Sequence, residues 1–485
     1  MNGLPLLPVV LWSDALLFAL LAVVVALALW ARAQPSLRLA WRRVAADPVA
    51  MVSATILAAF LLVALLDSLH YRARLPTLPG QATTQAYYAV EVTSALDALL
   101  APLRLHTEKT YSAPLATHLF AKEALADSPL RDFPRLVWGG AHLGDDLGEN
   151  PERHANDVLQ RATLGLVGGV LAWLALAWIV RRVRRTRRYP REKVGDGGTA
   201  IVANAADDRV ERGPPPARRA VMYTLLALCL LAGLATALAG GYHVLGTDKV
   251  GQDVLYLSLK SIRTGLLIGT LTTLVTLPLA VLLGILAGFV GGWVDDVVQY
   301  LYTTLNSIPG VLLIAAAVLM MQVLIDNHPG WFDTAAERAD ARLLALCLIL
   351  GMTSWTGLAR LLRGETLKLR ELEYVQAARA FGVGPLTIMR RHILPNLMHI
   401  VLISLVMDFS SLVLAEAVLS YVGVGVDPTT ISFGTMINAA RMELAREPMV
   451  WWSLAAAFGF MFALVLAANL FTDALRDAFD PRSAK

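Results

Sequence analysis

Nine long runs with few or no charged residues recur along this chain, and each approaches the roughly 20 residues that an α-helix needs to cross a bilayer. The runs lie at about 15–31, 50–66, 162–180, 220–240, 265–290, 297–322, 343–359, 397–421 and 449–471. With 56% hydrophobic and 16% charged residues, the 485-residue chain carries more apolar surface than one soluble core needs. The sequence therefore predicts an all-α polytopic membrane protein with about nine spans.

Lys and Arg gather after particular spans, and short loops rich in these residues stay in the cytosol. The three basic segments follow the first, third and seventh runs: Arg32, Arg38, Arg42 and Arg43; the run RRVRRTRR at 181–188; and Arg360, Arg363, Lys368 and Arg370. The segment before the first run has no Lys or Arg, so we expect the N-terminus outside and the C-terminus in the cytosol. The first run lacks a basic segment before it and a small-residue cleavage site after it, which favours an uncleaved span over a signal peptide.

The chain divides into four predicted regions. They are 1–67 with two spans, 68–160 with none, 161–240 with an additional pair of spans and a flexible basic loop at 181–219, and 241–485 with five spans. Region 68–160 reads as a small extracytoplasmic α+β or irregular insert, with helical periodicity at 92–103. Its histidines lack metal-ligand spacing, so we expect surface or capping roles and no metal site. These histidines are His70, His106, His118, His142 and His154.

The composition disfavours both a disulfide framework and a nucleic-acid partner. The chain has two cysteines, Cys229 and Cys347, both within apolar runs, which favours burial as small hydrophobes over a disulfide framework. The net charge of +4 lies in loops that flank the membrane, and no basic groove with interleaved aromatics occurs, so no nucleic-acid partner is expected. The basic loops point instead to membrane lipid.

The most informative polar segment is ELEYVQAARAFGVGPLTIMRRHILPN at 371–396, between the seventh and eighth runs. Residues 371–381 favour a helix, Gly382 can take the left-handed conformation that ends one, and Pro385 suits the first turn of the next. The segment therefore predicts two short helices joined by a tight corner. We call residues 371–396 the 371–396 loop; with its approach it extends over 364–396.

Two adjacent alanines, a glycine four residues later and a downstream Ile-Leu-Pro are spaced as in the cytosolic loop of ATP-binding-cassette importer permeases, which this segment resembles. The matching positions, with the residue before the alanines, are Gln376, Ala377, Ala378, Gly382, Ile393, Leu394 and Pro395. A glutamate usually precedes the alanines in that family, so Gln376 removes one charge-assisted contact. The resemblance implies a loop that docks on a separate ATPase; a merely connecting amphipathic loop is the alternative.

A second segment, HVLGTDKVGQD at 243–253, is similar to the segment before the second core span in the C-type subunits of dipeptide, oligopeptide and nickel permeases. The matching positions are Gly246, Thr247, Asp248, Gly251 and Asp253. Gln252 stands where that family has an arginine, which removes a fixed positive charge. From the residues alone, Asp253 is an N-cap for the helix that follows. We expect this outer loop to be the place where a substrate-delivering protein docks.

The resemblance covers roughly 243–482 and, more loosely, 38–66. It implies a type I importer permease core of about six transmembrane helices, made of the span at 50–66 and the last five. The other three spans and the insert at 68–160 would then be additions. An alternative, which the sequence leaves open, is that the span at 220–240 takes the place of the family's first span.

Two carboxylates, Asp408 and Glu416, lie inside the eighth run, where an ionisable group is costly unless it faces protein, water or a partner. Eight residues separate them, which places them about 80° apart on a helix. They are candidates for the translocation path or for the seam with a second subunit. A structural hydrogen bond between helices is the alternative.

The resemblance implies a permease subunit in the bacterial inner membrane that forms half of a translocation path for peptides or similar small solutes. Its implied partners are ABC ATPase subunits, a second homologous permease and an extracytoplasmic substrate-binding protein. The chain contains no Gly-Lys dipeptide and hence no phosphate-binding loop of the Walker type, so we expect a non-catalytic subunit without a bound cofactor, with ATP and Mg on the partner ATPase. The alternatives are a secondary transporter driven by an ion gradient, which has no need of the 371–396 loop, and a membrane-embedded enzyme or scaffold.

Overall fold

The structure is a computed structural model that describes residues 6–33, 35–75, 87–124, 131–144, 151–186, 215–332 and 334–479. The chain forms two compact units, which are described separately. Unit 1 comprises 1–33, 60–101 and 257–485, and unit 2 comprises 34–59 and 102–256. The predicted flexible loop at 181–219 lies largely outside the described residues.

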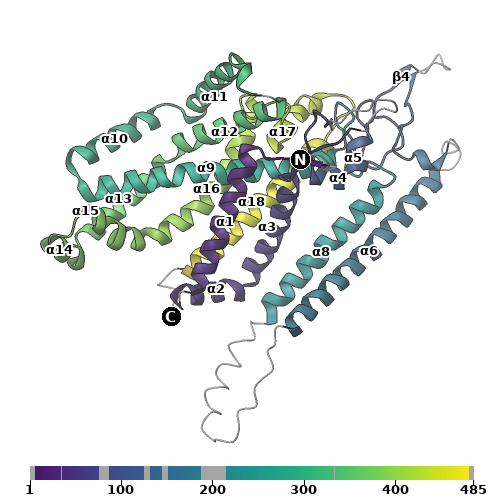
Figure 1. Cartoon of the computed structure of the whole chain (residues 1–485). Coiled ribbons are helices and arrows are strands. Elements are labelled where there is room, and N and C mark those ends of the chain that lie inside the picture. Colours follow the sequence, from purple (N-terminus) through teal and green to yellow (C-terminus); the bar gives the residue numbers. More distant parts are fainter. Residues whose placement is uncertain are drawn as a thin grey trace, which may run out of the picture. The chain divides into compact units, whose positions relative to one another are not determined.

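Long apolar helices dominate both units (Figure 1). Among the described residues, seven helical segments are long and apolar enough to cross a membrane. They are α3 (Pro48–Asp67), α6 (Pro151–Thr186), α8 (Pro215–Ala239), α9 (Val254–Val290), α12 (Ala335–Ser354) with α13 (Thr356–Arg370), α16 (Leu394–Val422) and α18 (Trp452–Phe479). Helix α1 (Trp12–Ala33) contains a shorter apolar stretch at Trp12–Ala26. The predicted polytopic helical architecture is confirmed.

The sixth predicted span is not a single straight helix. It consists of α10 (Gly292–Ser307) and α11 (Gly310–Asp326), which meet at an angle of 90° and make an eighth span if they are counted together. Pro309 lies at this break as the N-cap of α11. Because proline has no N–H and clashes with the preceding turn, α10 cannot continue through it. Pro309 is a local signal for such a break, but the angle between the two helices is not encoded in that residue.

Unit 1 is held by close helix packing around α9. A side chain at Gly284 would lie 2.7 Å from the carbonyl oxygen of Ala359 in α13, and one at Gly288 would lie 2.6 Å from Cβ of Thr366. The two glycines therefore let the backbones of α9 and α13 come within direct contact. The surrounding core contains fully buried Leu362.

Helix α1 is bound into unit 1 by buried charges. Arg263 of α9 donates to Asp14 at 2.6 Å, and Lys260, one turn earlier, donates to Asp97 at 2.7 Å. Asp14 is fully buried, and His70 also contacts it at 2.7 Å. A three-stranded antiparallel sheet consists of β1 (Leu6–Val9), β2 (His70–Ala73) and β3 (Thr93–Ser94). His70 is the first residue of β2, and Asp97 belongs to α4 (Ala95–Leu99), which follows β3 in the chain.

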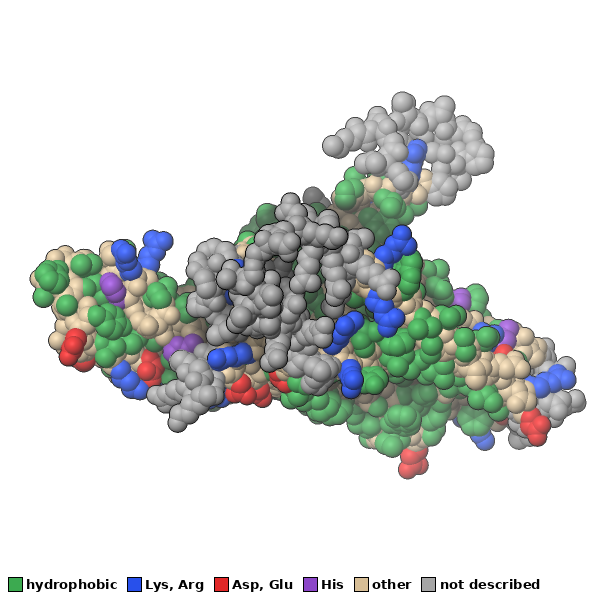
Figure 2. Space-filling view, turned by 90° about the horizontal axis from the view of Figure 1, so that it is seen from below, with side chains coloured by type: hydrophobic (Ala, Val, Ile, Leu, Met, Phe, Trp, Pro, Cys, Tyr) green, Lys and Arg blue, Asp and Glu red, His purple; other side chains and the backbone are tan. Residues whose placement is uncertain are grey.

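Unit 2 contains a tight hairpin of α6 and α8. A side chain at Gly165 would lie 2.6 Å from the carbonyl oxygen of Gly233, and one at Gly169 would lie 2.6 Å from that of Cys229. Small residues at such positions are the usual means by which membrane helices approach closely. Large side chains on the other faces, such as Leu164 and Leu231, are exposed, as expected for helices that contact lipid. Hydrophobic side chains likewise cover much of the described surface in Figure 2.

The remaining elements of unit 2 are short, apart from the basic helix α2 (Pro35–Ala46). They are α5 (Ala101–Leu105), which begins one residue before the unit, β4 (Glu123–Ala124) paired with β5 (Arg131–Asp132), and the 3₁₀ turn η1 (Ala141–Leu143). Together with β2, β3 and α4 of unit 1, they show that the predicted insert is a mixture of short helices, short strands and irregular backbone. The helical periodicity at 92–103 corresponds to α4 and α5.

Candidate functional site

The 371–396 loop has the predicted backbone. Helix α14 (Glu373–Ala380) has Phe381 as its C-cap, Gly382 follows with φ of +75°, and α15 (Pro385–Ile388) begins with its proline in the first turn. A left-handed residue favours glycine, so the corner depends on Gly382. In Figure 1, α14 and α15 form one end of unit 1, far along α9, α13 and α16 from α17 (Phe433–Arg441).

A π-helical turn, η4 (Met389–Ile393), joins α15 to α16. Pro395 lies in the first turn of α16 and has no N–H to donate to the preceding turn, so a wider turn before it avoids an unmatched hydrogen bond. This π turn was not predicted from the sequence. The one sequence signal for this turn was Pro395.

The resemblance positions in this loop fall into two groups. Ile393 is fully buried and Ala378 packs against the same hydrophobic core, so these two residues anchor the loop to unit 1. Leu394, like Ala378, is half-buried against this core. The exposed group consists of Gln376, Ala377, Gly382 and Pro395. Gln376 donates to the carbonyl oxygen of Glu371 at 3.2 Å within the loop itself.

Two large apolar side chains stand out at the corner, and the sequence analysis did not identify them. Phe381 is 87% exposed and Leu386 is 75% exposed, on either side of Gly382. Exposed apolar side chains that rest on a rigid, anchored corner mark an interaction surface. Their position in the sequence could have indicated this exposure, because large apolar residues that flank a turn glycine in a polar loop have no hydrophobic core in which to be buried.

The 246–253 loop is a second compact structure, in unit 2. Asp248 accepts hydrogen bonds from the backbone N–H groups of Val250 and Gln252 at 2.9 and 2.8 Å. Asp253 caps the start of α9 by accepting from Leu255 at 2.8 Å. The predicted capping role of Asp253 is therefore present in the structure.

This loop is joined to the insert. The hydroxyl of Thr247 accepts from the N–H of Ser112 at 2.7 Å and donates to the carbonyl oxygen of Thr110 at 2.9 Å. Gly251 has φ of +77°, and a side chain there would lie 1.8 Å from the carbonyl oxygen of Glu108. No residue other than glycine fits between the two segments.

A buried charge cluster lies at this junction and consists of Glu108, His243 and Asp253. Asp253 contacts Nδ1 of His243 at 2.9 Å, and Glu108 lies 3.4 Å from Nε2, which is an ion-pair contact rather than a good hydrogen bond. Burial alone would lower the pKa of His243, but Asp253 and Glu108 raise it to about 9. The imidazole is therefore a cation held between two carboxylates at neutral pH.

Glu108 also organises the backbone of the insert. Its carboxylate accepts from the N–H groups of Val137, Trp138 and Gly139 at 2.8, 2.8 and 3.1 Å. Burial opposes ionisation of Glu108, but these bonds and His243 outweigh it and lower the pKa below its usual value. The sequence analysis did not single out Glu108, because its partners are up to 135 residues away.

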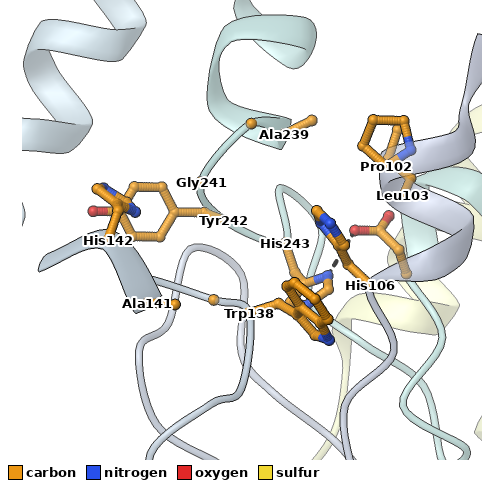
Figure 3. Close-up of a pocket in the computed structure, with 13 residues that line it drawn as sticks. Pro102, Leu103, His106, Trp138, Ala141, His142, Ala239, Gly241, Tyr242 and His243 are labelled. Carbon is orange, nitrogen blue, oxygen red and sulfur yellow. Dashed lines mark hydrogen bonds and ion pairs between the residues drawn. The ribbon is translucent and has the colours of Figure 1, made fainter. Parts of the chain in front are cut away.

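A pocket of about 170 Å³ lies beside the cluster, within unit 2. His106 and Trp138 stack on one side at a ring-centroid distance of 4.4 Å, and His142 and Tyr242 lie on the other (Figure 3). His243 lies between them in the lining. In the described part of the chain, no group of three or more His, Cys, Asp or Glu residues is arranged to hold a metal ion.

The two carboxylates of the eighth run have different surroundings in α16. Glu416 is 1% exposed and accepts hydrogen bonds from Ser420 at 2.7 Å and from Ser432 at 2.9 Å. Because Ser432 is the N-cap of α17, Glu416 joins α16 to α17. Asp408 is half-buried, and no described residue forms a hydrogen bond or ion pair with its carboxylate.

Comparison with known proteins bears on the C-terminal part of the chain. The family of binding-protein-dependent transport system inner membrane components matches residues 280–485. The oligopeptide transport system permease protein OppC of Mycobacterium tuberculosis (strain ATCC 25618 / H37Rv) is 31% identical over 244 residues, which are 50% of this chain and 77% of that protein. The chain belongs to this permease family.

Two further relatives of the permease are similar to the same extent. The glutathione transport system permease protein GsiD of Pectobacterium atrosepticum is 33% identical over 242 residues, which cover 50% of this chain and 73% of that protein. A putative peptide permease protein of Brucella suis biovar 1 is 32% identical over 241 residues, covering 50% and 74%. The chain is thus a transmembrane permease subunit of an ABC importer, and it spans the inner membrane several times.

Proposed function

We propose that this permease forms half of the translocation path for peptides or closely related small solutes. Three relatives support this cargo class, since they are named for oligopeptides, peptides and glutathione. The chain would pair with a second homologous permease and receive its cargo from an extracytoplasmic binding protein. A separate ATPase would bind ATP and Mg and supply the work.

The observation that carries this proposal is the 371–396 loop. Its tip presents Phe381 and Leu386 to the surroundings, while Ile393 and Ala378 fix its base in the core of unit 1. An apolar tip on a rigid base suits insertion into a groove of a partner ATPase. Movement of that partner would then reach α16 directly, because the π turn joins the loop to this helix without an intervening flexible segment.

A second set of contacts would transmit movement of the 371–396 loop to α9 and α13. Arg379 of α14 lies over the ring of Phe289 in α9 at 5.3 Å, and Arg370 of α13 donates to the carbonyl oxygen of Gly288 at 3.4 Å. The glycine contacts between α9 and α13 make these two helices move together. A tilt of the 371–396 loop would therefore be transmitted to at least three spans.

We infer the orientation in the membrane from α9 and the basic residues. Helix α9 begins directly after Asp253 and is 37 residues long, about 55 Å, which exceeds the roughly 30 Å of a bilayer core. Its other end lies beside Arg370, in the segment rich in Lys and Arg. Hence we assign the 246–253 loop to the outside, the 371–396 loop to the cytosol, the N-terminus to the outside and the C-terminus to the cytosol.

The test replaces Gly382 with valine in the complete importer. A β-branched residue cannot adopt φ of +75° without strain of the order of 1–3 kcal/mol, so the corner should reorient Phe381 and Leu386. We expect cargo-stimulated ATP hydrolysis and uptake to be lost while the permease remains in the membrane.

Gly384→Ala is the matched control, because Gly384 has φ of −60° and open space around it. This variant should transport normally. Normal uptake by Gly382→Val would contradict the docking role of the loop.

A further inference from the structure

The carboxylate of Asp408, which pairs with none of the residues that the structure describes, has a distinctive position on α16. Ser404 and Ser411 lie four residues before it and three residues after it, so the three polar side chains fall within roughly 60° of one helix face. We call Ser404, Asp408 and Ser411 the polar strip. Ser411 donates to the carbonyl oxygen of Asp408 at 2.8 Å, which leaves the carboxylate free of that hydroxyl.

The rotation of α16 about its own axis is fixed by Phe409, the residue that follows Asp408. The ring of Phe409 fills the space beside Gly269 of α9, where a side chain would meet Cε2 of the ring at 2.4 Å. One residue corresponds to about 100° of rotation, so Asp408 points well away from this contact. On the same helix, it is Glu416 that joins α16 to α17 through Ser432.

The polar strip borders the uncovered side of α16. Met407 is 56% exposed and Val418 is 50% exposed, and both lie next to the strip on the helix surface. A carboxylate at membrane depth is costly unless it faces protein, water or a charged partner, so this edge of α16 does not face lipid. The side of α16 that carries Asp408 therefore borders either a passing solute or another protein chain.

We infer that Asp408 binds the positively charged amino group of the cargo as it passes along α16. The inference rests on the proposed function and gives its cargo a chemical class, solutes that carry an ammonium group, such as peptides with a free N-terminus. Charge complementarity supports this assignment, because a lone carboxylate in a low-dielectric surrounding binds a cation strongly. The hydroxyls of Ser404 and Ser411 would accept the remaining ammonium hydrogens.

The experiment uses the complete importer, with both permeases, the ATPase and the binding protein, reconstituted in vesicles. Two labelled peptides are compared, one with a free amino terminus and one with an N-acetylated terminus. The pair is chosen so that the isolated binding protein binds both with equal affinity. Uptake is measured at saturating binding protein, so that differences report on the membrane step.

We expect the wild-type importer to transport the free-amine peptide about tenfold faster than the acetylated one, as befits one charge-assisted hydrogen bond. Asp408→Asn should remove this preference, and Asp408→Glu should retain it. Asp132→Asn, an exposed carboxylate in the insert, is the matched control and should behave as wild type. An unchanged ratio in Asp408→Asn would overturn the inference, as would loss of the second permease from the purified variant, because Asp408 would then belong to the seam.

A second measurement does not depend on the stability of Asp408→Asn. In a variant without Cys229 and Cys347, Ser411→Cys should react faster with a cationic thiol reagent than with an anionic reagent of the same size, and the free-amine peptide should slow the reaction. Absence of any charge preference at this position would sink the inference. Failure of the wild-type importer to move either peptide with ATP would remove the proposed function instead, and with it the basis of this inference.

Discussion

Glu108 shows how one buried residue can order a segment of chain that has little secondary structure. Its carboxylate holds three consecutive backbone N–H groups, at 137–139, and faces the imidazole of His243. Each bond on its own contributes modestly, but removing the shared acceptor would leave three backbone donors without this partner, two of them part-buried and that of Gly139 buried. A single position thus links the insert to the segment that leads into α9.

The His243 contacts predict a pH dependence of stability. The pKa of His243 is about 9 in the folded protein against an ordinary value of 6.5, so its charged form stabilises the folded state fully below about pH 6.5. This contribution is lost as the pH rises through about 9, and its upper bound is about 3 kcal/mol. The measurement is the thermal unfolding midpoint of wild type and His243→Gln from pH 6 to pH 9.5.

The difference between the two proteins should shrink as the pH rises, because the variant lacks the titrating cation. Using this difference cancels the other ionisable groups, which both proteins share. A difference that stays constant over this range would show that His243 is neutral in the folded protein.

Among the elements, the α6 and α8 hairpin is the clearest case of packing set by small residues. Gly165 and Gly233 oppose each other so closely that neither tolerates a side chain. The two helices contact one another along their lengths, while their outer faces carry exposed Leu, Val and Trp side chains. The hairpin thus obtains its internal stability from backbone contact rather than from large interlocking side chains.

A pair of glycine variants tests this packing. Gly233→Val places a side chain 2.4 Å from the carbonyl oxygen of Gly165, whereas Gly168→Val on α6 meets nothing within 4 Å. We expect Gly233→Val to lower the stability by about 1–3 kcal/mol through overpacking, seen as a lower thermal midpoint in detergent. Gly168→Val carries the same cost in helix propensity and should change the midpoint little; equal effects would refute direct backbone contact.

Elements that depend on local signals were predictable from the sequence. Gly382 and Pro385 specify the corner of the 371–396 loop because φ and the missing N–H are properties of the residues themselves. The 90° angle at Pro309 was not predictable, since it depends on what α10 and α11 pack against. The π turn before Pro395 was likewise missed, because its width is settled by the register of α16.

Contacts between distant segments were the least predictable part of the site. Asp408 and Glu416 looked equivalent in sequence, but only the structure brings Ser432 to Glu416, whereas no residue in the described part of the chain pairs with the Asp408 carboxylate. His243 and Glu108 are separated by 135 residues, and no periodicity relates them. Burial decides these roles, and burial of a polar residue is a property of the folded chain.

At the scale of the whole molecule, the proposed orientation in the membrane can be tested by cysteine labelling at two exposed positions. Val250 is 69% exposed in the 246–253 loop, and Phe381 is 87% exposed in the 371–396 loop. With Cys229 and Cys347 removed, Val250→Cys should react with a membrane-impermeant thiol reagent in intact cells stripped of their outer membrane. Phe381→Cys and Thr199→Cys should react only after the inner membrane is opened.

Both outcomes have the same physical origin, because Lys and Arg are more numerous around Phe381 and Thr199 in the sequence than in the 246–253 loop, which contains only Lys249. The order of addition of the reagent, before or after permeabilisation, is the internal control. Labelling of Phe381→Cys in sealed cells would reverse the assignment of the two loops and separate the 371–396 loop from any cytosolic ATPase.

The close fit of Gly251 against Glu108 has a consequence for biosynthesis. Residues 102–144 leave the ribosome long before Gly251, and α6 and α8 are made in between. The early segment therefore has to wait, with the Glu108 carboxylate still hydrated, until both apolar helices and the 246–253 loop have been made. A pause or a failed insertion at α6 or α8 would leave the segment unfinished, so its completion reports that the preceding helices were inserted correctly.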